Sequence, residues 1–293
     1  MSAAIAGLVG ISDKTAMYKY AKYPLTLPLL IGMAQSTVGI VIISVFGIPD
    51  EATFEATGYA AISGVLFGLG GILGQRILFT QEVSRTVPIQ QAAPIFAALM
   101  AMFLLNESIS LLQWIGILAT VSGCALLSIR FNTTEGSIML HKSFYVLMLS
   151  ALLMGGANVV GKIALEELPI GYTHGVRMLT LGIIFLIFSF RPLPWADVKG
   201  YFLRRSPVLL LVSVNEFVTA NVAMFLLLWA LSEGPVSLVT AIWSTRALFI
   251  VLYGIGLATI WRGALGEQIS PSTVATKVLS ASLIVAGVSA IAV

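Results

Sequence analysis

The sequence predicts an all-α integral membrane protein with ten transmembrane helices, arranged as two inverted five-helix repeats. Hydrophobic residues make up 58% of the 293 residues and charged residues only 10%, with a mean hydropathy of +0.99. A soluble domain carries about a quarter charged residues, so this composition could not cover a water-facing surface. The apolar residues also fall into runs near the roughly 20 residues that cross a bilayer. Finally, the two halves of the chain resemble each other.

Polar breaks divide the chain into ten apolar runs, and prolines stand at or just before several starts, where a missing N–H costs nothing. In chain order, the expected spans are residues 2–20, 25–46, 58–79, 87–105, 111–129, 144–165, 170–190, 207–231, 236–260 and 273–292. The longest connections, 131–143 and 191–206, are too short to hold a soluble domain. The sequence therefore predicts a multi-pass protein whose function lies within the membrane.

Matching residues recur in the two halves. Residues of the first span reappear with the same spacing in the sixth: Ser2, Ala3, Gly7, Lys14 and Ala16 match Ser150, Ala151, Gly155, Lys162 and Ala164. Because five spans per half is an odd number, the second half crosses the membrane in the opposite direction, as in many secondary transporters. We expect a first repeat over 1–131, a linker over 132–143 and a second repeat over 144–293. The first span is shorter than the sixth, and a truncated opening helix is one explanation that the sequence leaves open.

Several of these features resemble the EamA-type transporters of the drug/metabolite transporter superfamily. The resemblance is carried by the two five-span halves, by Arg177 in the second span of its half, and by a Leu-x-Glu-x-Ile-Ser turn at 105–110 and 265–270. It implies a secondary transporter that works by alternating access in the plasma membrane of a bacterium or archaeon. It implies neither catalysis nor a cofactor or metal. One departure is Leu29, which stands where the second half has Arg177.

Charged residues near the middle of three spans give the functional signal. Arg177, Glu216 and Arg246 lie roughly 12–17 Å beyond the prolines that open their spans, at 1.5 Å per residue. A charge at the bilayer centre costs about 2.5–3.5 kcal/mol, and such residues usually line a cavity or pair with one another. With polar and aromatic neighbours at helical spacing, the predicted substrate-binding residues are Asn158, Arg177, Asn215, Glu216, Thr219, Trp243 and Arg246. The alternative is that Glu216 pairs with one arginine only to hold helices together.

Two arginines against one glutamate leave a surplus positive charge, which suits a carboxylate or phosphate, while Glu216 could accept an ammonium group. Phe217 and Phe225 would add apolar contact. The sequence thus predicts an exporter or exchanger of a small zwitterionic or anionic metabolite, such as an amino acid or a derivative. We also expect both arginines to keep Glu216 ionised, so that transport is not strictly proton-driven. The alternatives are a lipid or lipid-linked substrate flippase of the same fold, and a membrane-embedded enzyme acting on an isoprenoid or lipid.

The expected partners are the small-molecule substrate and the lipid bilayer, with a homodimer as a further possibility. The basic residues form no cluster that would bind nucleic acid. Asp13 and Lys14 fall near the end of the first span, where Lys14 is expected to reach the headgroups. Glu107 and Glu267 stand at the starts of the last spans of their halves, and we interpret them as carboxylates at helix N-termini.

Charge bias and family resemblance disagree on orientation. The loops after the first, third, fifth, seventh and ninth spans carry the basic residues Lys19, Lys22, Arg85, Arg130, Lys142, Arg191, Lys199, Arg204, Arg205 and Arg262. On the side of the termini the expected basic residue is Lys162 alone. Short loops rich in Lys and Arg stay in the cytoplasm, so charge predicts both termini outside, whereas the resemblance implies cytoplasmic termini.

Overall fold

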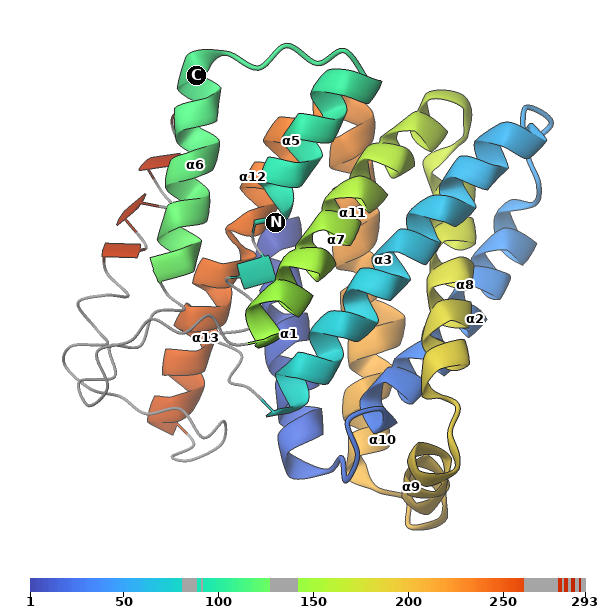
Figure 1. Ribbon diagram of the computed structural model, residues 1–293. Helices are drawn as coiled ribbons and strands as arrows, with labels where there is room; N and C mark the ends of the chain where they lie inside the picture. Colours follow the sequence, from blue (N-terminus) through green and yellow to red (C-terminus); the bar gives the residue numbers. More distant parts are fainter. Residues whose placement is uncertain are drawn as a thin grey trace.

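A computed structural model describes residues 1–80, 89–90, 92–126 and 142–260, together with scattered positions between 279 and 290. The described residues form a bundle of helices without a strand, most of them running along a common direction (Figure 1). The first half contributes α1 (Ser2–Lys19), α2 (Thr26–Phe46), α3 (Phe54–Thr80), α5 (Ala93–Leu104) and α6 (Leu111–Leu126). The second contributes α7 (Lys142–Glu167), α8 (Ile170–Ser189), α9 (Pro192–Leu203), α10 (Pro207–Ser213), the π-helix η1 (Val214–Thr219), α11 (Ala220–Glu233), α12 (Val236–Ser244) and α13 (Arg246–Ile260).

Six described segments are long and apolar enough to cross a membrane. They are Thr26–Phe46, Phe54–Thr80, Ser143–Glu167, Ile170–Ser189, Pro207–Glu233 and Val236–Gly254, and two shorter apolar helices, Ala93–Leu104 and Leu111–Gly123, accompany them. The expected span 273–292 lies mostly outside the described residues. The chain is therefore an integral multi-pass membrane protein, while the ten-helix inverted repeat stays a prediction.

Small residues let α8 approach both α2 and α3 closely. A Cβ atom at Gly64 of α3 would contact the hydroxyl of Thr180 and the carbonyl oxygen of Arg177, and one at Gly39 of α2 would contact the backbone of Leu179. Without a hydrophobic driving force between helices in lipid, such close packing is a main source of association. The small residues of α3 thus serve packing within this chain.

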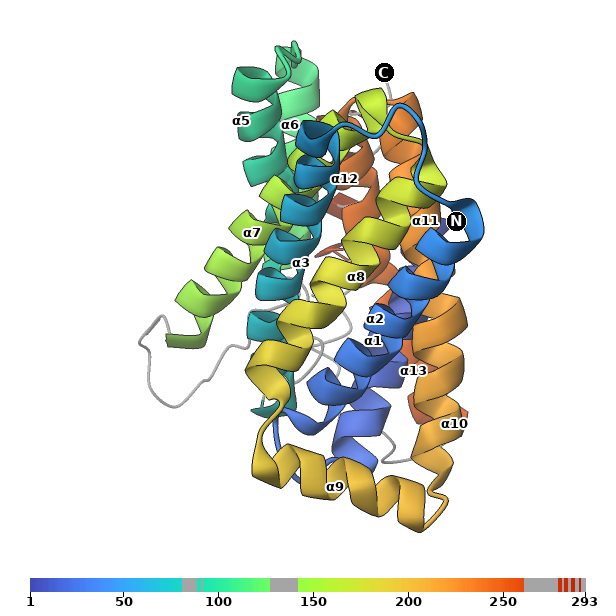
Figure 2. The same cartoon turned by 90° about the vertical axis from the view of Figure 1, so that its right-hand side faces the viewer.

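α9 is a helix in a segment that the hydropathy pattern left as a connection. It begins at Pro192, a position where the backbone N–H that proline lacks would have no acceptor within the helix. The helix lies across the end of the bundle (Figure 2). The Asp197 carboxylate holds it in place, accepting hydrogen bonds from the Lys22 amide at 3.0 Å and the Thr26 hydroxyl at 2.9 Å. The Tyr201 hydroxyl donates to the carbonyl oxygen of Tyr20 at 2.7 Å. Burial, then the Asp197 charge, raises the pKa of Tyr201, so this donor keeps its proton.

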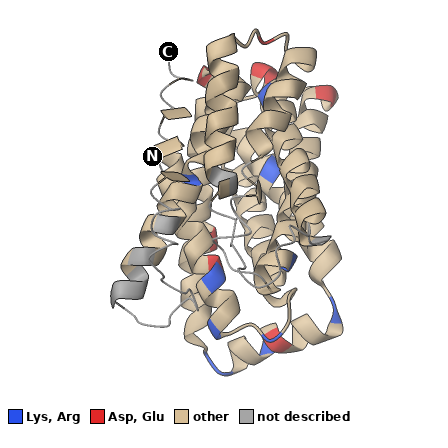
Figure 3. Ribbon diagram, turned by 60° about the vertical axis from the view of Figure 1, so that its left-hand side comes forward, with Lys and Arg blue, Asp and Glu red and all other residues tan. Residues whose placement is uncertain are grey.

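Acidic residues predominate at one end of the bundle and basic residues at the other (Figure 3). The turns between α2 and α3, between α7 and α8, and between α11 and α12 carry the acidic residues Asp50, Glu51, Glu55, Glu166, Glu167 and Glu233. The opposite end, with α9 and the turn between α1 and α2, carries the basic residues Lys19, Lys22, Arg191, Lys199, Arg204 and Arg205. Because successive helices run in alternate directions, each group gathers at one end.

Candidate functional site

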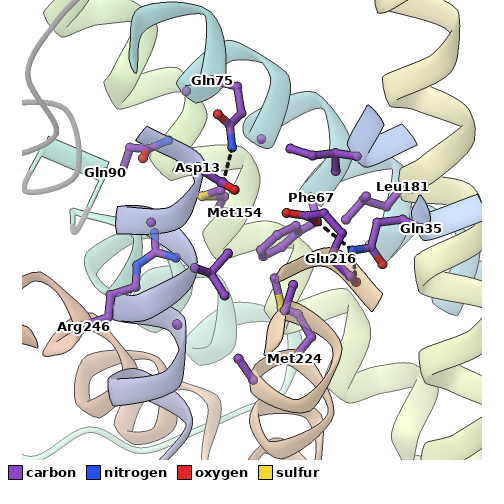
Figure 4. Close-up of a pocket in the computed structure, with 18 of the residues that line it drawn as sticks. Asp13, Gln35, Phe67, Gln75, Gln90, Met154, Leu181, Glu216, Met224 and Arg246 are labelled. Atoms are coloured by element: carbon purple, nitrogen blue, oxygen red, sulfur yellow. Dashed lines mark hydrogen bonds between the residues drawn. The ribbon is translucent and has the colours of Figure 1, made fainter. Parts of the chain in front are cut away.

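A cavity of about 160 Å³ lies at the centre of the bundle, between the two halves of the chain (Figure 4). Its walls come from α1, α2, α3 and Gln90 of the first half and from α7, α8, η1, α11, α12 and α13 of the second. Apolar side chains such as Phe67, Phe185 and Met154 form much of the lining, and a few polar groups interrupt it. Cavities with mostly apolar walls and a few convergent polar groups are the usual form of a small-molecule site.

Two buried carboxyl groups meet on one side of this cavity. Asp13 of α1 and Glu216 of η1 are 6% and 3% exposed, and both line the cavity. The Asn215 side-chain amide nitrogen joins them, donating to Asp13 Oδ1 at 2.9 Å and to Glu216 Oε1 at 2.8 Å. Gln75 donates to Asp13 Oδ2 at 2.7 Å, and Gln35 donates to Glu216 Oε2 at 3.0 Å. All of these donors are neutral side-chain amides.

The π-helix η1 presents Glu216 to the cavity. Its wider turn interrupts the α10–α11 span at the acidic residue, and π-turns of this kind occur frequently at functional sites. The Glu216 carbonyl oxygen accepts hydrogen bonds from the side chains of Gln35 at 3.1 Å and Asn221 at 2.6 Å, which tie the turn to α2 and α11. Thr219 instead donates its hydroxyl to the Val214 carbonyl oxygen at 3.3 Å and lies outside the cavity lining.

A second irregularity brings Trp243 and Arg246 to the cavity. The ninth expected span breaks into α12 and α13 at Thr245. The hydroxyls of Ser244 and Thr245 donate to the carbonyl oxygens of Ala241 at 2.6 Å and Ile242 at 2.7 Å, a local bonding pattern that bends helices. Both Trp243 and Arg246 line the cavity, and the Arg246 guanidinium carbon lies 4.1 Å from the Trp243 ring centroid. This cation–π contact places the guanidinium group at the wall.

Arg177 and Asn158 lie behind the cavity wall. Arg177 is 1% exposed, and its Nη2 donates to the Asn158 Oδ1 at 3.0 Å. Its guanidinium carbon lies 4.8 Å from the ring centroid of Phe67, and Phe67 is the residue that lines the cavity. The remaining nitrogens, Nε and Nη1, have no hydrogen-bond partner among the described residues. Among the described residues, the alternative in which Glu216 pairs with Arg177 is not observed, because the side-chain amide of Asn158 on α7 accepts from Arg177 instead.

The structure also corrects the interpretation of α1. Lys14 is 7% exposed and donates to the Leu78 carbonyl oxygen at 2.8 Å, so it does not reach the headgroups. Asp13 lies beside Glu216 rather than at the membrane surface, since α1 packs inside the bundle against α11 and α13. The expectation that two arginines keep a single buried acid ionised thus loses its basis.

Other predicted residues fall in different places. Phe217 and Phe225 are 44% and 38% exposed and lie outside the lining, although Phe225 packs edge-on against His174. Glu107 is a helix N-terminal carboxylate as expected, but of α12 rather than α6: it accepts from the backbone amides of Val236 at 2.6 Å and Ser237 at 3.2 Å. Sequence reasoning missed Gln35 and Gln75, for which the available signal was a glutamine within an apolar span.

Comparisons with known proteins agree with the fold. One crystal structure of a protein aligns over 99% of this chain and 96% of its own, with a TM-score of 0.65 and 16% sequence identity. At this identity, the likeness concerns the fold alone. No curated protein matches the sequence. The EamA-like transporter family matches residues 1–129. Residues 1–129 are therefore similar to the EamA-like transporter family, in a chain that is an integral multi-pass membrane protein.

Proposed function

We propose that this chain is a secondary transporter that exports or exchanges a small zwitterionic metabolite, an amino acid or a derivative, through its central cavity. The observation that carries the proposal is the placement of a cation and two carboxylates around one cavity. Arg246, Asp13 and Glu216 all line this cavity, and Asp13 lies between the other two in the view of Figure 4. Arg246 would bind the substrate carboxylate, and the acid pair would bind the ammonium group.

The charges around the cavity favour a zwitterion over a simple anion. The surplus positive charge inferred from the sequence counted Arg177, which lies behind Phe67, and left out Asp13. With Asp13 and Glu216 on the wall, a purely anionic ligand would meet two carboxylates as well as Arg246. An ammonium group could donate hydrogen bonds to both carboxyl groups, whose hydrogen-bond donors given above are neutral amides.

Cavity volume favours a small substrate over a lipid. A cavity of about 150 Å³ holds a molecule of the size of benzene, and the central cavity has about 160 Å³. The small amino acids fall in this range, whereas a phospholipid does not. The volume therefore supports metabolite transport rather than the flippase alternative.

Packing between the halves supports alternating access of two inverted repeats. α1 packs against α11 and α13, while its counterpart α7 packs against α3 and α5. The opening helix of each half thus contacts the third and fourth spans of the other half, which is the relation that a pseudo-two-fold axis would give. Substrate sites of inverted-repeat transporters lie at the interface of their repeats, and this cavity is lined by residues from both halves of the chain.

We propose that the basic end of the bundle, where α9 lies, faces the cytoplasm. Short loops rich in Lys and Arg remain in the cytoplasm, and the acidic residues gather at the opposite end. A reporter fused after Val293 is therefore expected on the outer side, where added protease cleaves it in intact cells. A reporter that is cut only after cell lysis would contradict this orientation.

A ligand comparison tests the substrate class. Purified protein would be heated with each of the common amino acids, with the amine that lacks the carboxylate, and with the acid that lacks the ammonium group. A ligand that binds the folded state raises the melting temperature by mass action. We expect at least one amino acid to stabilise the protein more than either of its truncated analogues does. An acid analogue that stabilises as well as its amino acid would overturn the zwitterion proposal.

A further inference from the structure

A second cavity lies at the basic end of the bundle, away from the central one. Its volume is about 840 Å³, and it forms where the turn before α2, the last turns of α3 and the start of α9 meet. Val146, near the start of α7, completes the wall. Organic ligands commonly occupy pockets of about 300–1,000 Å³. This groove therefore has the size of a ligand site.

The groove combines an apolar wall with two arginines. Leu25, Leu73, Ile77 and Val146 contribute aliphatic surface from three different parts of the fold. Arg76 and Arg191 line the same groove, and both are exposed. Arg76 lies about 6 Å of helix before Thr80, the last described residue of α3, at 1.5 Å per residue.

We propose that this groove binds an anionic phospholipid, with its phosphate between Arg76 and Arg191 and an acyl chain along the aliphatic wall. Among the described residues that line it, none is acidic. Basic pockets between transmembrane helices are the usual sites for anionic headgroups. On α9, the exposed aromatic side chains Trp195 and Phe202 suit the membrane interface.

The lipid site shares a helix with the transport cavity. Gly74, Gln75 and Leu78 of α3 line the central cavity, whereas Leu73, Arg76 and Ile77 line the groove. This turn of α3 therefore has one face on the groove and the opposite face on the central cavity. On the cavity side, Gln75 Nε2 donates a hydrogen bond to Asp13 Oδ2 at 2.7 Å. A lipid in the groove would hold this turn of α3 in place. The proposal stands on the groove alone and holds whatever substrate the central cavity carries.

The test compares two lipids with the same acyl chains, added to the purified full chain in detergent: phosphatidylglycerol, which is anionic, and phosphatidylcholine, which is zwitterionic. Native mass spectrometry counts bound lipid, and the melting temperature reports stabilisation. The variant R76Q/R191Q removes both charges from the groove. The control R204Q/R205Q removes the same charge from the same end of the bundle, at residues outside the lining.

We expect the unmodified protein and the control to prefer phosphatidylglycerol. In R76Q/R191Q this preference should fall by about 30-fold, since each basic residue near a headgroup contributes about a factor of five. The further variant L73W keeps both arginines and fills the groove, and it should also lose bound phosphatidylglycerol. Equal binding of the two lipids, an equal loss in the control, or the same stabilisation by inorganic phosphate alone would overturn the proposal.

Discussion

Replacing Arg246 with Ala should abolish amino acid binding while leaving a folded, monodisperse protein. Truncating one member of a desolvated charge pair costs about 2 kcal/mol or more, so affinity should fall at least about 30-fold. Isothermal titration with the best amino acid measures the loss. The decarboxylated amine of that amino acid should bind the variant as it binds the unmodified protein, because it has no group for Arg246 to hold.

The matched control is Arg204→Ala, which removes an exposed arginine at the α9 end of the bundle. It should leave the affinity unchanged, and thus separate a contact in the cavity from the net charge of the protein. If R246A binds the amino acid normally, Arg246 does not hold the substrate carboxylate.

Replacing Glu216 with Gln should lower the affinity for the amino acid and for its amine, again at least about 30-fold. The reason is that one of the two acidic groups that would bind the ammonium group is lost. The affinity for the acid analogue should not fall, since this ligand has no ammonium group. Glu216→Asp keeps the charge and should recover part of the affinity. The same titrations with these three ligands measure each effect.

The control is Glu233→Gln, which makes the same chemical change at an exposed position at the end of α11. It should bind all three ligands like the unmodified protein. A loss of amine binding in E233Q equal to that in E216Q would show that the effect does not arise in the cavity.

Hydropathy predicts the helices better than it predicts the site. The second span was expected at 25–46, and α2 runs from Thr26 to Phe46, because a long apolar run bounded by Pro24 and Gly47 permits little else. Hydropathy did not predict α9, because a helix of 12 residues is too short to span a membrane and the search was for membrane spans.

Spacing along the chain identified Glu216, Trp243 and Arg246, which line the cavity, but it could not predict how their helices turn. The π-helix η1 and the break at Thr245 both depend on local hydrogen bonds that no apolar pattern records. These two irregularities decide which neighbours face the cavity. They explain why Thr219, one helical turn from Asn215 on an ideal helix, bonds its own backbone instead.

Asp13 shows a different limit. Distance from the end of a span measures depth along one helix, whereas the partner of a buried charge comes from another helix. Asp13 and Glu216 are joined by the side chain of Asn215, which lies 202 positions after Asp13 in the sequence. Only packing brings them together. Gln35 and Gln75 were also not predicted as site residues, because a neutral amide within an apolar span is a weaker signal than a charged residue.

Counterflow in proteoliposomes tests the central claim most directly. Vesicles that contain the protein would be loaded with the best-binding unlabelled amino acid, and uptake of the same labelled amino acid would be followed without an ion gradient. The account predicts rapid exchange in the unmodified protein and in R204A, and exchange at the level of empty vesicles in R246A and E216Q. Exchange that persists in both cavity variants would contradict a transport site between Arg246 and the Asp13–Glu216 pair.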